Sequence, residues 1–126
     1  VLMGGVNDIF YSGEDTGARA NMGAMVQQVL TAGGRCVVLS PLAASFPTVT
    51  PEWREVIRPS NKAVMEAYHQ WLALFCRTFH VPYVELYDLL RDEDGTPRPE
   101  MYLDGLHPTA EGHRLMAERI ANGLRK

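Results

Sequence analysis

Two short motifs hold the residues whose types and spacing suit catalysis. The first is Gly5-Val6-Asn7-Asp8, and the second is Asp104-Gly105-Leu106-His107-Pro108. An aspartate and a histidine three residues apart meet across one turn, where the carboxylate fixes the tautomer of the imidazole. The other imidazole nitrogen is then free to act as a general base. Asn7 offers a side-chain amide, which is a suitable donor to an oxyanion.

The elements that must position these motifs alternate between strand and helix. Short apolar runs predict three strands, at residues 1–6, 35–39 and 83–87. Apolar side chains at helical spacing predict three helices, at residues 16–32, 60–79 and 109–124. This order predicts an α/β domain with a parallel sheet, right-handed crossovers and helices on both faces. Sites in such sheets lie beyond the carboxyl ends of the strands, where Asn7 and Asp8 are expected.

A long irregular segment, residues 41–59, contains four prolines and separates the second strand from the second helix. Loops of this length are uncommon inside a domain and often have a function. One interpretation is a mere connection. The other is that its Phe46 and Trp53 form a wall of a substrate pocket.

The two motifs resemble those of the SGNH (GDSL-type) serine hydrolases. Gly5-Val6-Asn7-Asp8 is similar to the family's G-x-N-D block, and Asp104-Gly105-Leu106-His107-Pro108 resembles its closing D-x-x-H-P block. The resemblance covers essentially the whole chain and implies a flavodoxin-like fold with three layers. It implies triad roles for Asp104 and His107, an oxyanion-hole role for Asn7, and supporting positions for Gly5 and Asp8. The implied activity is that of an esterase, lipase or thioesterase that needs no cofactor and no metal.

The expected nucleophile departs from this family pattern. The family's serine lies in a Gly-Asp-Ser block upstream of every residue here, and none of the serines of this sequence, Ser12, Ser40, Ser45 and Ser60, follows Gly-Asp. We therefore expect the serine on a preceding segment or on a second polypeptide. Residues 1–126 are then a single, N-terminally truncated domain without its first strands, and the chain alone is inactive.

The missing strands leave the strand expected at Val1 to Val6 as an open apolar edge. Exposed apolar edges pair with other chains. We expect a complementary N-terminal fragment, or the same strand of a second copy in a homodimer, to cover this edge.

The composition excludes several classes of protein. Hydrophobic residues make up 46% and charged residues 21% of the 126 residues, as in one ordinary globular domain. No apolar run is long enough to span a membrane, and a net charge of −3 gives no indication of a basic surface that would bind nucleic acid. Cys36 and Cys76 lie in apolar segments, which predicts reduced core thiols. His69 and His80 have no carboxylate or cysteine at ligand spacing, which argues against a metal site.

A second function stays open at this point. A catalytically inactive flavodoxin-like module for binding or assembly would explain the missing serine without a further segment. It would not explain why Asn7, Asp104 and His107 occur together. The identity of the small-molecule ester and the compartment, cytoplasmic or secreted, also stay open.

Overall fold

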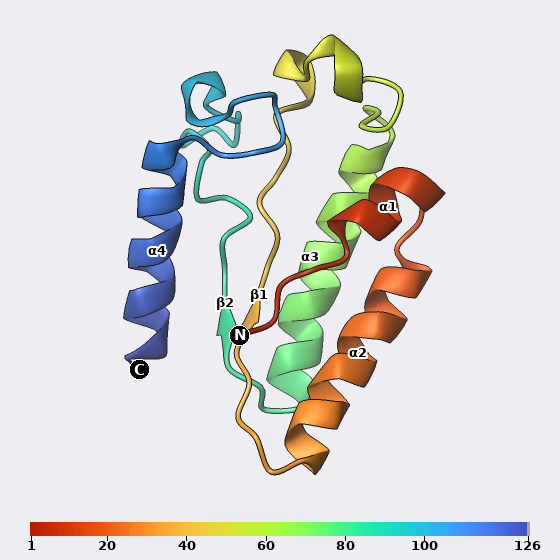
Figure 1. The fold of residues 1–126 in the computed structure, drawn as a ribbon, viewed down its shortest axis with the longest axis vertical. Coiled ribbons are helices and arrows are strands. Elements are labelled where there is room, and N and C mark those ends of the chain that lie inside the picture. The colour runs from red at the N-terminus through yellow and green to blue at the C-terminus, as the bar shows by residue number, and fades with distance from the viewer. Residues whose placement is uncertain (126) are drawn as a thin grey trace.

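A short parallel sheet runs through the middle of the structure, a computed structural model that describes residues 1–125 (Figure 1). Strand β1 (Val38–Leu39) pairs in parallel with β2 (Tyr83–Val84), with Val38 opposite Tyr83 and Leu39 opposite Val84. Leu2 adds an isolated parallel bridge to Val38 on the other side of β1. The α/β class and the parallel pairing are therefore as predicted, although the regular strands are shorter than the apolar runs.

The helices surround this sheet. They are α1 (Val6–Ser12), α2 (Thr16–Thr31), α3 (Asn61–Thr78) and α4 (Ala110–Leu124). In Figure 1, α4 lies on one side of the strands, and α2 and α3 lie on the other. Three short 3-10 turns, Phe46–Thr48, Pro51–Trp53 and Pro99–Met101, interrupt the long connections. Among residues 1–125, no helix combines the length and the apolar character that a membrane crossing requires.

The three long helices, α2, α3 and α4, begin and end within about two residues of the bounds predicted from the spacing of their apolar side chains. The α2 and α3 helices pack together through buried side chains such as Met22 and Val26 on α2 and Met65 and Leu72 on α3. The hydroxyl of Thr109 caps α4 by accepting a hydrogen bond from the Gly112 N–H at 3.2 Å. These helices hold their places because each buries one apolar stripe and leaves a polar face outside.

The predicted strand at Val1 to Val6 is wrong over most of its length. Only Leu2 bridges to the sheet, and Val6 already begins α1, which the sequence analysis did not predict. Gly5 turns the chain with a φ of 104°, in the left-handed region that favours glycine. The helix that follows buries Ile9 and Phe10, so burial of these two side chains replaces further strand pairing.

Gly5 also brings α1 against α3. The Tyr68 hydroxyl donates a hydrogen bond to the Gly4 carbonyl oxygen at 2.9 Å. A Cβ atom on Gly5 would lie 2.7 Å from atoms of the Tyr68 ring. The backbone conformation and the close approach therefore both require glycine at this position, two residues before Asn7.

The two cysteines are buried and free, which confirms the prediction of core thiols. Burial and the neighbouring Cys36 raise the pKa of Cys76 to about 11. Cys76 is therefore protonated at neutral pH and acts as a small apolar side chain.

Candidate active site

Asp104 and His107 meet in the turn that leads into α4. Nδ1 of His107 lies 2.7 Å from Oδ2 of Asp104. The other carboxylate oxygen, Oδ1, accepts hydrogen bonds from the backbone N–H groups of Leu106 at 2.9 Å and His107 at 2.7 Å. The Asp104 side chain is 17% exposed and the His107 side chain 56% exposed. The carboxylate is thus fixed inside the turn, while the imidazole is more exposed and its Nε2 has no hydrogen-bond partner among residues 1–125.

Two opposing effects set the pKa of Asp104. Partial burial acts to raise it, but the hydrogen bonds from the backbone and ring of His107 and from the Leu106 N–H outweigh burial and lower the pKa. Asp104 is therefore ionised at neutral pH. An ionised carboxylate at Nδ1 keeps the proton on that nitrogen and stabilises the imidazolium when Nε2 takes a second proton.

The proline-rich loop holds this turn in place. The N–H of Ser45 donates to the Gly105 carbonyl at 2.7 Å, and the N–H of Thr50 donates to the Asp104 carbonyl at 3.1 Å. Gly105 has a φ of 87°, and a Cβ there would lie 2.7 Å from Cα of Val49. The loop is therefore more than a connection, since its backbone forms the support for the Asp104–His107 turn.

The same loop brings an aromatic side chain to the turn. The ring centroid of Trp53 lies 5.8 Å from that of His107, with the two planes inclined at 55°. Phe46, the other aromatic residue singled out in this loop, packs against the apolar core and is partly buried. Only Trp53 of these two residues forms an aromatic pair with His107 within residues 1–125.

Asn7 and Asp8 lie in the first turn of α1, and both are exposed. They line an open surface hollow together with Tyr11, Ser12 and Glu14. In Figure 1, α1 and the turn before α4 both lie toward the end of the molecule to which the strands run. No hydrogen bond joins Asn7 to Asp104 or His107 within residues 1–125, so the hydrogen-bonded group of residues 104–107 does not include Asn7.

None of the four serine hydroxyls makes a hydrogen bond to His107 within the described part of the chain. The Ser12 hydroxyl donates to a carbonyl of its own helix at 2.6 Å. Ser40 and Ser45 are buried and hydrogen-bonded to other side chains. Ser60 is exposed and precedes α3. The structure therefore brings no serine of residues 1–125 to the imidazole.

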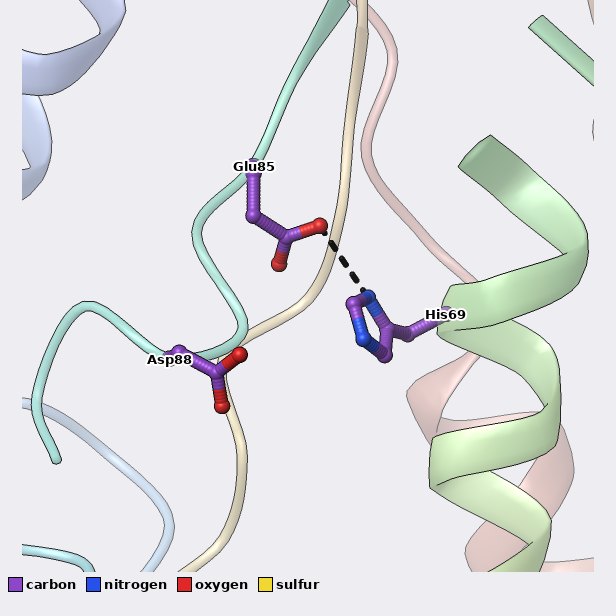
Figure 2. Close-up of side chains that lie close together, drawn as sticks. All are labelled: His69, Glu85 and Asp88. Carbon is purple, nitrogen blue, oxygen red and sulfur yellow. Dashed lines mark ion pairs between the residues drawn. The ribbon is translucent and has the colours of Figure 1, made fainter. Parts of the chain in front are cut away.

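A second histidine lies among carboxylates, which the sequence analysis missed. Figure 2 shows His69 of α3 facing Glu85 and Asp88 of the segment after β2. Nδ1 of His69 is 3.1 Å from Oε2 of Glu85, and one ligand atom of each of the three residues lies within 4.8 Å of the others. The sequence has no carboxylate at ligand spacing from His69, and this spacing gave the wrong indication. The fold brings residues from two elements together.

The contacts of Glu85 favour a structural contact with His69 over a metal site. Its Oε2 also accepts from the Tyr83 hydroxyl at 2.7 Å, and its Oε1 accepts from the Ser40 hydroxyl at 3.0 Å and the Tyr87 N–H at 2.7 Å. Donors therefore occupy both oxygens of Glu85 that a cation would need. The imidazole also stacks on Tyr87, with ring centroids 4.3 Å apart, so His69 serves to tie α3 to this segment.

Replacing Ser40 with alanine should lower the free energy of unfolding. The buried Ser40 Oγ accepts the N–H groups of Leu86 at 2.7 Å and Tyr87 at 2.9 Å. Without it the Leu86 N–H loses this partner, which costs about 1–3 kcal/mol. Urea unfolding measures this loss, and Ser60→Ala is the exposed control. A Ser40→Ala protein as stable as the unsubstituted chain would show that these hydrogen bonds do not stabilise the segment after β2.

Comparisons with known proteins identify the family and the fold. The model of the GDSL-like Lipase/Acylhydrolase family matches residues 1–115. A GDSL-like lipase from Bacteroides thetaiotaomicron has a similar structure, with a TM-score of 0.70 and 20% identity over 84% of this chain and 50% of that one. The esterase domain of the ZfL2-1 ORF1 protein from a zebrafish retrotransposon gives 0.66 and 20% over 86% of this chain and 57% of that one.

The chain spans about half the length of these two solved structures. At such identities the structural likeness shows the fold alone. A search of the curated proteins found no match.

Proposed function

The chain belongs to the GDSL-like lipase/acylhydrolase family, and we propose that it supplies the base and the oxyanion asparagine of a serine ester hydrolase. The family match confirms the resemblance drawn from the two motifs, and ester hydrolysis is the activity of the family. The observation that carries the proposal is the 2.7 Å contact between His107 Nδ1 and Asp104 Oδ2. A tautomer fixed in this way leaves Nε2 as a general base.

In the proposed reaction, a serine from outside residues 1–126 attacks the ester carbonyl carbon. Nε2 of His107 takes the serine proton and then returns it to the leaving alcohol as the carbon–oxygen bond breaks. Water, deprotonated by the same nitrogen, then attacks the acyl-serine, and the proton returns to the serine as the acid leaves. Asp104 orients the ring and stabilises its cation in both halves. These steps move only protons and the acyl group, so the proposal includes no cofactor and no metal.

We place the serine-bearing segment along residues 1–5. On one side, Leu2 bonds to β1 through its N–H to the Val37 carbonyl and its carbonyl to the Leu39 N–H, both at 2.8 Å. Val1 and Met3 are 68% and 50% exposed, and no backbone hydrogen bond of Met3 appears within residues 1–125. An exposed apolar edge of this kind suits a further strand, from an N-terminal fragment or a second copy. The domain completed in this way is proposed to have the three-layer, flavodoxin-like arrangement.

The test of the proposed oxyanion role is Asn7→Ala in the hydrolase assembled with its serine-bearing segment. Loss of one oxyanion donor lowers kcat by about 10²–10³-fold, so hydrolysis should be severely reduced and still measurable. A p-nitrophenyl ester assay measures the loss. The matched control is Asn122→Ala at the far end of α4, where the side chain bonds to Arg125. A reduction of less than about threefold for Asn7→Ala would remove Asn7 from the site.

A further inference from the structure

The imidazole of His107 is hydrogen-bonded at one atom and has an aromatic neighbour, Trp53. Its side chain is 56% exposed, and within residues 1–125 its ring forms one hydrogen bond, from Nδ1 to Asp104. A single bond fixes the place of Nδ1 but leaves the ring free to swing about it. The Trp53 ring limits this swing, since it lies against the imidazole with ring centroids 5.8 Å apart.

Trp53 is itself fixed on both sides of its backbone. Its N–H donates to the Thr50 carbonyl at 3.0 Å, and its carbonyl accepts from the Ile57 N–H at 2.7 Å. The side chain is half-buried and packs against the main apolar core. The Thr50 N–H in turn donates to the Asp104 carbonyl at 3.1 Å. Trp53, Asp104 and His107 therefore belong to one hydrogen-bonded unit, although some fifty residues separate the tryptophan from the others.

We propose that Trp53 is a positioning residue for the catalytic His107. It holds the imidazole in the orientation that presents Nε2 to the serine, and its electron-rich ring stabilises the imidazolium that forms during proton transfer. This inference rests on the proposed function of the Asp104–His107 pair. It differs from the pocket-wall interpretation of the same residue, because a positioning residue acts on kcat whichever acyl chain is bound. A contact of this kind contributes about two- to tenfold to a rate.

The contact can be tested in the chain by fluorescence. The sequence has two tryptophans, Trp53 and Trp71. Trp71 stacks on Phe75, with ring centroids 4.9 Å apart, so Trp71→Phe isolates the emission of Trp53 and keeps an aromatic ring in the stack. An imidazolium in contact with an indole quenches its emission. The emission of Trp71→Phe should therefore fall as the pH is lowered from about 8 to 5, the range in which histidines take up a proton.

The control for this measurement is the double variant Trp71→Phe/His107→Gln. Its emission should stay level over the same pH range, because no imidazolium can form at position 107. Emission of Trp71→Phe that does not respond to pH would overturn the inference. A response that persists in the double variant would overturn it as well, since another group would then be responsible.

The catalytic role is tested in the hydrolase assembled with its serine-bearing segment. Trp53→Ala should lower kcat about two- to tenfold with KM changed less than about twofold, for short and long acyl esters alike. Trp53→Phe keeps an aromatic ring and should recover most of the rate, which separates positioning from a general loss of folding. Trp71→Phe removes the other indole and should leave kcat unchanged. A change confined to KM that varies with acyl length would make Trp53 a pocket wall instead.

The same variants separate this inference from the proposed function. If His107→Ala abolishes hydrolysis while Trp53→Ala leaves kcat unchanged, the proposed function stands and the positioning role is wrong. If His107→Ala leaves hydrolysis intact, the proposed function fails. The fluorescence result needs no hydrolysis, so it reports on the Trp53–His107 contact in either case.

Discussion

Replacing His107 with alanine in the assembled hydrolase should lower kcat by about 10⁴- to 10⁶-fold. Nε2 of His107 is the only base that the proposed reaction uses, and the serine hydroxyl is a weak nucleophile without it. Replacing Asp104 with asparagine should cost about 10⁴-fold, because the amide no longer holds the proton on Nδ1. Initial rates with an activated ester measure both losses, and circular dichroism confirms that the variants are folded.

The matched control for this prediction is His113→Ala. His113 is also exposed and lies on α4 shortly after the active turn, but its Nδ1 lies 3.0 Å from the Thr109 carbonyl oxygen, and no ion pair joins it to a carboxylate of residues 1–125. It should retain nearly full activity. The double variant Asp104→Asn/His107→Ala should be no slower than His107→Ala alone, since the two groups act as a unit. Additive losses would contradict a shared role.

Replacing Gly105 with alanine should lower the free energy of unfolding by about 2–4 kcal/mol. The φ of 87° strains any residue with a Cβ, and the new atom would lie 2.7 Å from Cα and 2.8 Å from N of Val49. These are backbone atoms of the loop that supports the active turn, so relief requires the loop and the turn to move apart. Urea unfolding of the chain measures the loss.

Gly95→Ala is the control that separates strain from the close contact. Gly95 has a similar φ of 83°, but a Cβ there would lie within 4 Å of no heavy atom outside its chain neighbours in the described part of the chain. Its substitution should therefore cost only the backbone strain, about 1–2 kcal/mol. Equal losses at positions 95 and 105 would show that the packing of Gly105 on Val49 does not stabilise the turn.

The parts of the fold that follow from local sequence were predictable. The helices α2, α3 and α4 each carry an apolar stripe longer than two turns, and Thr109 is a strong N-cap residue. The helix α1 was not predictable in this way, because seven residues are too few to show a period. The chain leaves the sheet at Gly5 because of the φ angle of this residue. An apolar run in the sequence does not by itself reveal that angle.

The same distinction between local and long-range information applies to the candidate site. The contact of Asp104 with His107 lies within one turn, so their spacing in the sequence predicts it. The contact of Trp53 with His107 depends on the path of the proline-rich loop, and that of His69 with Glu85 depends on how α3 packs against β2. Residues that meet through such long-range contacts have no characteristic spacing in the sequence. Only the folded structure shows that they are in contact.

The most direct test of the central claim is intact-mass analysis after reaction with a serine-directed fluorophosphonate. The claim is that the Asp104–His107 pair activates a serine outside residues 1–126. The predicted result is an adduct on the serine-bearing segment and none on residues 1–126, with the adduct lost in His107→Ala. An adduct on Ser12, Ser40, Ser45 or Ser60, or labelling that survives His107→Ala, would contradict the claim.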